Sequence, residues 1–289
     1  MTGVLDGRQA LITGANQGLG LEIARFFVRE GASVFICARD GGALEEAASE
    51  LRELAGDGER VRAQTADVSD RSSVDDLVAG AIAAFPDLSI LVSNAGVYGP
   101  KGSIWDVDWD EWARAIEINL LGSVLVTRAI APHLRRRGGG KVIQLSGGGA
   151  TSPLPGLSAY AASKAGIVRF VETVALELRD DRVDVNAIAP GALNTRMLDE
   201  VIEAGPDRVG AAFHERALEQ AQKGGTPLAK GAELAVWLAS SDSDGISGKL
   251  LSAVWDPYRE FAEHRDDLDS DIYTLRRIVP GDRGKDWGG

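Results

Sequence analysis

The sequence predicts an α/β fold, a doubly wound parallel sheet of about seven strands with helices on both faces. Three observations predict it. Short apolar runs alternate with amphipathic stretches of about ten to fifteen residues, a glycine-rich turn follows the first run, and small or polar residues close most later runs. Because ligands of such sheets bind at the carboxyl ends of the strands, these turns predict a site along one edge.

The elements follow one another in order along the chain. Strands are expected at residues 9–13, 33–38, 61–66, 89–93, 141–146, 183–189 and 249–253. Helices are expected at 21–30, 43–55, 72–85, 108–137 (as one helix or two), 158–179, about 195–222 and 231–240. Apolar periodicity supports each helix, and Gly31 ends the first one. Asn119 lies within the apolar stretch 108–137, where it either holds a water or kinks the helix.

The turn after the first strand predicts a site for a pyrophosphate. Its candidate residues are Gly14, Asn16, Gln17, Gly18, Leu19 and Gly20. Glycines let the backbone approach the ligand, and the free N–H groups at the start of the next helix face the anion. The spacing is Gly-x-x-x-Gly-x-Gly, which differs from the Gly-x-Gly-x-x-Gly fingerprint, so a plain structural turn is the alternative.

The next two strands end in residues that can choose and hold a cofactor. Arg39 closes the second strand, and an arginine there suits the 2′-phosphate of NADP(H), whereas an acid would suit the 2′-hydroxyl of NAD(H). Asp40 complicates this reading, since a small shift of the turn would present its carboxylate instead. Asp67 and Val68 follow the third strand, where Asp67 either hydrogen-bonds an adenine amino group or caps the next helix.

Tyr160 and Lys164 are four residues apart at the start of a predicted helix, so their side chains share one face. An ammonium beside a phenol favours the phenolate and lowers the pKa of the tyrosine below its usual value of about 10. The pair could therefore act as an acid–base device for a carbonyl or an alcohol, although a surface pair has the same spacing. Ser146 ends the fifth strand and either donates a hydrogen bond to a substrate oxygen or caps the turn.

Composition limits the partners. The chain has 289 residues, 44% of them hydrophobic, and its formal charge of −12 argues against nucleic acids and anionic membranes. The single cysteine, Cys37, lies in an apolar strand and excludes an intramolecular disulfide. No leader peptide and no uninterrupted apolar stretch of spanning length are expected, which favours the cytoplasm. His133, His214 and His264 are scattered, so no metal site is expected.

Taken in order, these motifs resemble those of the short, single-domain branch of the short-chain dehydrogenase/reductase family. They are residues 13–20, Asn94-Ala95-Gly96, Asn119, Ser146, Tyr160-x-x-x-Lys164 and Pro190-Gly191-x-x-x-Thr195. Each is weak alone, but the ordered set over residues 5–253 is specific. The resemblance implies a single seven-stranded Rossmann domain over residues 1–253 and an NADP(H)-dependent oxidoreductase that interconverts a ketone and a secondary alcohol.

The resemblance also implies roles for individual residues. Tyr160 would be the proton donor to a ketone or the base toward an alcohol. Lys164 would lower the pKa of the tyrosine and hold the nicotinamide ribose. Ser146 would fix and polarise the carbonyl oxygen, and Asn119 would seat a water that links Lys164 to solvent. The nicotinamide half would be cradled by Asn94, Ala95, Gly96, Pro190, Gly191, Leu193 and Thr195.

Family resemblance further implies a homotetramer or homodimer built on two long helices, here about 111–136 and 158–179. Two other functions stay open. One is a catalytically silent dinucleotide-binding regulator on the same scaffold, which the presence of all four catalytic positions does not favour. The other is a sugar-nucleotide epimerase or dehydratase of the longer branch, whose glycine spacing and separate substrate domain are not visible here. The interval from Ser146 to Tyr160 looks one residue longer than usual.

Residues 254–289 form an extension beyond the last expected strand. Mixed charges with interleaved aromatic residues favour an ordered segment over a disordered one. One interpretation is a packing arm across an oligomer interface. The other is a lid over the substrate, with Tyr273, Arg276 or Arg277 meeting an anionic or sugar-like ligand, because guanidinium groups match carboxylates and phosphates and aromatic faces suit sugar rings.

Overall fold

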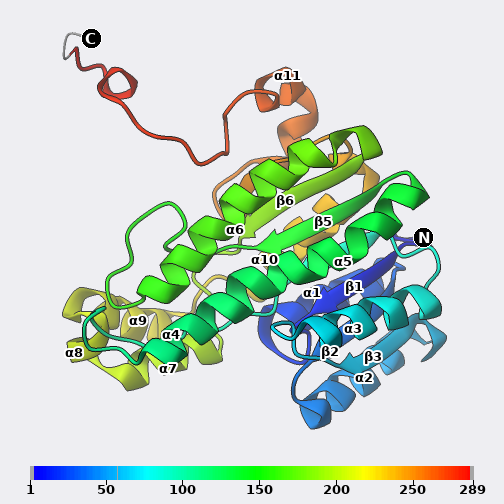
Figure 1. Cartoon of the computed structure of the whole chain (residues 1–289), viewed down its shortest axis with the longest axis horizontal. Coiled ribbons are helices and arrows are strands. Elements are labelled where there is room, and N and C mark those ends of the chain that lie inside the picture. The colour runs from blue at the N-terminus through cyan, green and yellow to red at the C-terminus, as the bar shows by residue number, and fades with distance from the viewer. Residues whose placement is uncertain (1–2, 57, 287–289) are drawn as a thin grey trace.

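The computed structural model describes residues 3–56 and 58–286. Its centre is a wholly parallel sheet of seven strands in the order β3-β2-β1-β4-β5-β6-β7 (Figure 1). The strands are β1 Gln9–Thr13, β2 Ser33–Ala38, β3 Val61–Thr65, β4 Ile90–Ser93, β5 Gly140–Leu145, β6 Val183–Ala189 and β7 Leu250–Ser252. Both ends of each strand lie within one residue of the predicted ends. The order reverses between β1 and β4, where such folds form a ligand crevice.

Helices cover both faces of the sheet, which confirms the doubly wound prediction (Figure 1). They are α1 Gly18–Arg29, α2 Gly41–Ala55, α3 Arg71–Ala84, α4 Trp109–Ile116, α5 Gly122–Arg137, α6 Ser158–Glu177, α7 Arg196–Ala204, α8 Pro206–Val209, α9 Ala211–Lys223, α10 Leu228–Ala239 and α11 Arg265–Leu268. One apolar core joins the sheet to α1, α2 and α10, and a second joins it to α3, α5 and α6. Burial on both faces explains why the strands read as continuous apolar runs.

The helical stretch predicted over 108–137 is divided at its middle into two helices, the second of the two alternatives. Residues Glu117–Leu121 form a π-helical turn between α4 and α5, and Asn119 lies within it. Of the two readings of this asparagine, the structure therefore shows a local distortion of the helix. By length and average composition the stretch Trp109–Arg137 could cross a membrane, but Asn119, Arg128 and His133 interrupt its apolar run. Its side chains Val126 and Ile130 are buried under the sheet, as in the core helix of a globular protein.

The region predicted as one helical segment over 195–222 is three short helices, α7, α8 and α9. Glycines at positions 205 and 210, both with positive φ, separate them. Four buried residues, Leu198, Val201, Val209 and Ala217, give these helices a small core of their own, apart from the two main cores. Residues 196–223 are called the lid segment below. This segment is distinct from the C-terminal extension, residues 254–289.

The C-terminal extension begins as part of the body and ends away from it; residues 287–289 lie outside the described part. Tyr258, Phe261 and Leu268 join the core that contains α10. The Leu250 N–H of β7 donates to the Tyr273 carbonyl at 2.8 Å, so the extension runs beside the edge strand. Beyond Leu275 the chain projects from the body (Figure 1). The first part of the extension, through Leu275, is thus integral to the fold.

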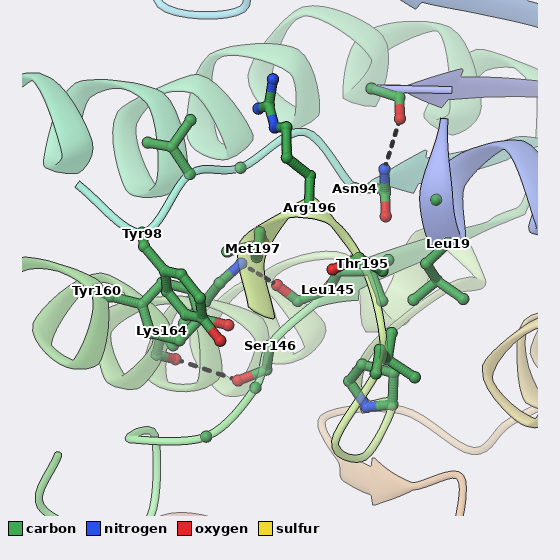
Figure 2. A pocket seen from close by; sticks show the side chains of 18 of the residues that line it. Leu19, Asn94, Tyr98, Leu145, Ser146, Tyr160, Lys164, Thr195, Arg196 and Met197 are labelled. Atoms are coloured by element: carbon green, nitrogen blue, oxygen red, sulfur yellow. Dashed lines mark hydrogen bonds between the residues drawn. The ribbon is translucent and has the colours of Figure 1, made fainter. Parts of the chain in front are cut away.

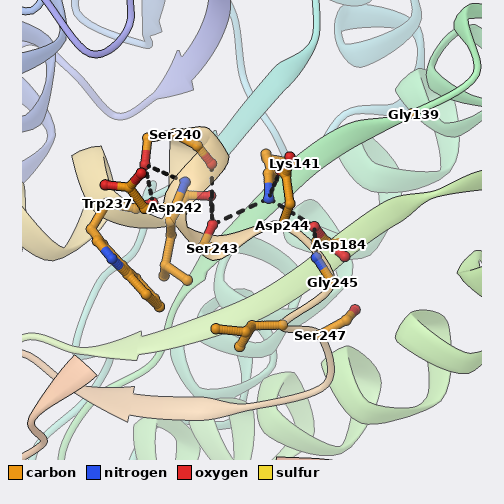
Figure 3. A network of polar contacts seen from close by, with 12 residues as sticks. Gly139, Lys141, Asp184, Trp237, Ser240, Asp242, Ser243, Asp244, Gly245 and Ser247 are labelled. Carbon is orange, nitrogen blue, oxygen red and sulfur yellow. Dashed lines mark hydrogen bonds and ion pairs between the residues drawn. The ribbon is translucent and has the colours of Figure 1, made fainter. Parts of the chain in front are cut away.

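A buried polar cluster ties the amino ends of β5 and β6 to the loop after α10. The Lys141 ammonium lies 2.7 Å from Asp184 Oδ2, 2.8 Å from Asp244 Oδ1 and 3.1 Å from the Ser243 hydroxyl (Figure 3). Lys141 is only 4% exposed, so both carboxylates compensate a charge that is largely removed from water. The cluster lies at the sheet edge opposite the carboxyl ends of the strands, and we interpret it as structural.

Candidate active site

Tyr160 and Lys164 lie one turn apart at the start of α6, and both are buried. The Lys164 ammonium donates a hydrogen bond of 2.7 Å to the Leu145 carbonyl, at the end of β5, and lies 5.6 Å from the centre of the Tyr160 ring (Figure 2). Burial lowers the pKa of Lys164 to about 8. The carboxyl end of β5 thus anchors the lysine beside the phenol.

The direction of the Tyr160 pKa differs from the expectation. Burial raises the pKa of its phenol, and the neighbouring Tyr98 adds to the rise. The spacing argument considered only the nearby ammonium, whereas the loss of water around the ring acts in the opposite direction and is larger. Tyr160 is therefore protonated at neutral pH in this structure, the state that a proton donor requires.

Ser146 lies directly after β5 and beside the phenol. Its N–H donates to the Ile188 carbonyl at 2.9 Å, and its hydroxyl donates to the Lys164 carbonyl at 3.4 Å. The Tyr160 hydroxyl lies against Gly147, the residue after Ser146, since a Cβ at Gly147 would lie only 2.5 Å from the phenol oxygen. Both hydroxyl groups therefore line the same part of the cavity (Figure 2).

This close approach gives a test of the phenol's position. We expect Gly147→Ala to lower kcat about 10- to 100-fold, because the new methyl group displaces the Tyr160 hydroxyl and small displacements of a reacting group are costly. Gly148→Ala is the matched control, since a Cβ there meets nothing within 4 Å. Steady-state kinetics and thermal melting of both variants are the measurements. Equal kcat for the two variants would contradict this placement of the phenol.

Asn119 joins the catalytic helix to the loop after β4. Its Oδ1 accepts from the Val97 N–H at 2.8 Å, and its Nδ2 donates to the Val97 carbonyl at 2.8 Å and to the Ser163 hydroxyl at 3.1 Å. A Cβ at Gly96 would lie 3.2 Å from Asn119 Oδ1 and 3.6 Å from Lys164 Nζ. Asn119 thus lies close to the lysine, and its amide holds protein groups on both sides.

The turn after β1 requires glycine at different positions for different physical reasons. A Cβ at Gly20 would lie 2.3 Å from the Gly14 carbonyl oxygen and 2.4 Å from Asn94 Nδ2, so this residue must be small for the turn to pack. Gly14 has a φ of +63° and lies against Ala95. Gly18, with a φ of +56°, begins α1, a Cβ there would meet only the Thr195 methyl group at 3.6 Å, and no acid lies in the first turn of that helix.

Asn94 fixes the neighbouring loop to this turn. Its Nδ2 donates to the carbonyls of Thr13 and Gly14 at 3.0 and 2.9 Å. The open N-terminus of α1 thus faces a rigid cradle, which an added side chain would fill. An anion is favoured at such a helix end. The residues present therefore fit the pyrophosphate of a dinucleotide cofactor.

The residues after β2 and β3 that were predicted to contact the adenosine half of a cofactor differ in their contacts. Asp40 caps α2 by accepting from the Ala43 N–H at 3.1 Å, while Arg39 is exposed, lines the cavity and makes no ion pair within residues 3–56 and 58–286. Asp67 instead accepts hydrogen bonds from Ser69 and lies 2.7 Å from Arg114.

The expectation that Asp67 could cap the next helix is wrong. Asp70 fills that position, because its carboxylate accepts from the Ser73 N–H at 2.7 Å and so satisfies a free donor of α3. The carboxylate of Asp67 lies outside the cavity lining, whereas the next residue, Val68, belongs to it.

One cavity of about 1290 Å³ brings most of the predicted residues together. Those that line it are Gly14, Asn16, Gln17, Gly18, Leu19, Arg39, Val68, Asn94, Ala95, Gly96, Ser146, Tyr160, Lys164, Pro190, Gly191, Leu193 and Thr195. Gly20, Asp67 and Asn119 lie behind the lining. In the part of the chain that the structure describes, no three His, Cys, Asp or Glu side chains gather as a metal site would require.

The structure adds cavity residues that sequence reasoning missed. Tyr98 packs edge-on against Tyr160, with ring centres 4.7 Å apart and an interplanar angle of 72°. Trp255 and Asp256, at the start of the extension, also line the cavity. Position relative to the strands was the available signal, since Tyr98 comes two residues after the Asn94–Gly96 turn and Trp255 follows the last strand.

The residues proposed for a lid in the extension lie elsewhere. Tyr273 packs against Phe261, with ring centres 5.3 Å apart, and Arg276 pairs with Asp271 and Asp282 at 3.0 and 2.8 Å. The structure does not bring Tyr273, Arg276 or Arg277 to the lining of the catalytic cavity of their own chain. The lid interpretation thus has no support within one chain.

Comparisons with known proteins agree with this architecture. The family model for short chain dehydrogenases matches residues 8–205. Oxidoreductase UcpA of Salmonella typhimurium is 36% identical over 249 residues, which cover 85% of this chain and 92% of that protein. Among solved structures, NAD⁺-bound xylitol dehydrogenase has a TM-score of 0.78 at 25% identity, covering 86% of this chain and 98% of its own.

The actinorhodin polyketide ketoreductase, solved with NADPH as a variant, gives a TM-score of 0.77 at 29% identity. That match covers 87% of this chain and 97% of the ketoreductase. The parallel seven-stranded sheet, the cavity at its carboxyl edge and the matching family model all lead to one conclusion. The chain belongs to the short-chain dehydrogenase family.

Proposed function

We propose that this protein is an oxidoreductase that interconverts a ketone and a secondary alcohol with NADP(H). The observation that carries the proposal is the convergence of Tyr160, Ser146 and Lys164 on one wall of a cavity that also reaches the glycine turn after β1. The similarity to a polyketide ketoreductase solved with NADPH supports the same chemistry. Acid–base groups and a dinucleotide cradle in one cavity are what hydride transfer to a carbonyl requires.

The chain's own residues would handle the proton and the orientation. When bound, NADP(H) supplies the hydride chemistry. In the reducing direction the Ser146 hydroxyl would hold the carbonyl oxygen, and Tyr160 would give that oxygen its proton. The Lys164 ammonium, 5.6 Å from the ring centre, would stabilise the phenolate that remains. In the oxidising direction Tyr160 would take the proton from the alcohol.

Binding of the cofactor would divide among three stretches of the cavity. The turn at Gly18 would hold the pyrophosphate at the N-terminus of α1. Arg39 and Val68 would meet the adenosine half. Residues 94–96 and 190–195 would cradle the nicotinamide half beside Tyr160, with Lys164 at the ribose. Asp67, whose carboxylate pairs with Arg114 in this structure, would hydrogen-bond the adenine amino group.

The preference for NADP(H) rests on Arg39. We expect Arg39→Ala to raise the KM for NADPH about tenfold or more and to leave the KM for NADH nearly unchanged, because charge-assisted bonds to a phosphate contribute about 1.5–3 kcal/mol. Arg71→Ala, at an exposed arginine on α3, is the matched control. Initial rates with each cofactor are the measurement. If KM rose equally for NADPH and NADH in Arg39→Ala, Arg39 would not determine the cofactor preference.

The proposed activity is tested by following NADPH oxidation over two groups of ketones, one apolar or acyl and the other phosphorylated, carboxylated or nucleotide-linked. Turnover in either group that disappears in Tyr160→Phe would support it. No turnover in either group or in the alcohol direction with NADP⁺, together with tight NADPH binding, would instead favour a regulatory dinucleotide-binding protein.

Assembly and location extend the proposal. A homotetramer or homodimer built on the long helices is supported by apolar side chains that remain exposed on them, with Trp109 67%, Leu121 49% and Leu176 65% accessible.

The partner of the site would be a small carbonyl or alcohol, with no nucleic acid or membrane, in keeping with the net charge of −12. A cytoplasmic location suits the free, buried Cys37. We further propose that residues 254–289 form a packing extension on a single catalytic domain.

A further inference from the structure

Tyr98 lies beside Tyr160, the proposed proton donor, in a loop whose backbone is held by hydrogen bonds. Both backbone groups of the preceding residue, Val97, are bound by the Asn119 amide at 2.8 Å. On the other side, the Lys101 ammonium donates to the Gly99 carbonyl at 3.2 Å and lies 5.8 Å from the centre of the Tyr98 ring. The backbone around Tyr98 is therefore held before and after the ring.

The ring of Tyr98 contacts two parts of the molecule at once. On one side it packs edge-on against Tyr160 at 4.7 Å, and Figure 2 shows the two rings beside Ser146 and Lys164. On the other side it packs against the small core of the lid segment, which contains Leu198 and Val201. Tyr160 thus lies near both the Tyr98 ring and the Lys164 ammonium.

An ion pair fastens the same loop to the lid segment. Lys101 Nζ lies 2.6 Å from Glu200 Oε2 on α7, and the Arg208 guanidinium donates to the Lys101 carbonyl at 3.4 Å. The ends of the lid segment are closed by a bridge between Leu193 and Thr226. With only a small core of its own, a segment of this kind opens more readily than the main cores. The Tyr98 loop is therefore a direct link between lid and catalytic group.

We propose that Tyr98 is a positioning residue that holds Tyr160 in its catalytic orientation and couples that orientation to closure of the lid segment, with Lys101–Glu200 as the latch. The proposal rests on the proposed reductase function, because it assigns Tyr160 as the proton donor. Tyr98 itself transfers no proton in it. An edge-to-face aromatic pair fixes the relative angle of two rings, and this is what the orientation of a phenol requires.

Three variants separate the ring, its hydroxyl and the latch. We expect Tyr98→Ala to lower kcat about 2- to 10-fold, since an aromatic pair of this kind contributes about 0.5–1.5 kcal/mol and tenfold corresponds to about 1.4 kcal/mol. Tyr98→Phe keeps the ring and should retain most of kcat. Glu200→Gln should raise KM and also lower kcat, by less than Tyr98→Ala does, because it loosens the lid and with it the orientation of Tyr160 but keeps the ring contact. Glu219→Gln, which breaks an exposed ion pair on α9, is the control.

The pH dependence of kcat gives a further test, because a purely structural role of Tyr98 would leave it unchanged. Burial raises the pKa of Tyr160, so exposing it in Tyr98→Ala should lower that pKa. In the reducing direction the phenol must be protonated, and the alkaline decline of kcat should therefore move to lower pH. Hydrogen exchange should show faster exchange over residues 196–223 in Tyr98→Ala and Glu200→Gln than in Glu219→Gln.

An unchanged kcat and pH profile in Tyr98→Ala would overturn the proposal, as would faster exchange of the lid segment without any effect on Tyr160. Failure of the reductase function would look different, because the wild-type protein would then turn over no carbonyl or alcohol. Ultraviolet titration of the Tyr160 phenol, taken as the difference from Tyr160→Phe, needs no turnover. With exchange data, it would still show whether Tyr98 couples the lid to Tyr160.

Discussion

Tyr160→Phe is expected to lower kcat for carbonyl reduction about a thousandfold or more, with the Kd for NADPH nearly unchanged. Phenylalanine keeps the ring that lies 4.7 Å from the centre of the Tyr98 ring and 5.6 Å from the Lys164 ammonium, but it removes the hydroxyl group proposed to give the substrate oxygen its proton. General acid catalysis is worth about 10²–10⁴-fold. The ring is 9% exposed, so losing its hydroxyl should change the thermal midpoint little.

The measurements are stopped assays of product formation and NADPH binding by fluorescence. Tyr273→Phe is the matched control, because that tyrosine packs against Phe261 outside the catalytic cavity. Wild-type activity should fall as pH rises through the pKa of Tyr160 in the reducing direction and should rise over the same range in the oxidising direction. Retention of a tenth or more of kcat in Tyr160→Phe would remove Tyr160 from the role of proton donor.

Most of the architecture could be predicted because it depends on local periodicity. Strands buried on both faces read as continuous apolar runs, and parallel strands need helices between them, so the common edge of their carboxyl ends follows. The candidate site was accessible for the same reason. Gly14, Ser146 and Asn94 all follow strands directly, and the carboxyl ends of parallel strands lie along one edge.

Features that depend on contacts between distant segments could not be predicted. Tyr98 reaches Tyr160 only through the fold, across 62 positions of sequence from 98 to 160. The raised pKa of Tyr160 depends on burial, which spacing along one helix does not report. The ion pair of Asp67 with Arg114, on a helix far along the chain, likewise could not be predicted from its position after β3. Each difference comes from a tertiary partner.

Lys164→Met is expected to abolish most activity and at the same time to stabilise the protein near neutral pH. The ammonium is 5% exposed, and its compensation in this structure is a hydrogen bond to the Leu145 carbonyl. Burial lowers its pKa from 10.5 to about 8, so keeping it charged at pH 7 costs free energy. Removing the charge from beside the phenol should lower kcat about 10²–10³-fold, as the loss of other groups that stabilise developing charge does.

The stability effect has a definite sign and pH range. Between pH 8 and 10.5 the unfolded chain binds one proton more than the folded chain, so wild-type stability rises with pH there, and the full penalty is present below pH 8. Each pKa unit is worth about 1.4 kcal/mol, and the lost hydrogen bond offsets part of this. We therefore expect Lys164→Met to raise the free energy of unfolding by about 1–3 kcal/mol at pH 7, and the gain to shrink as pH approaches 10.5.

Lys141→Met is the matched control, because that lysine is also buried but is paired with Asp184 and Asp244. Its removal leaves a carboxylate without its partner and should destabilise the protein, with kcat unchanged. Urea unfolding at pH 7 and pH 10 and steady-state kinetics distinguish the two lysines. If both variants lost stability equally, the charge of Lys164 would be structural. A gain for Lys164→Met alone would mean that the site keeps a costly buried charge for its chemistry.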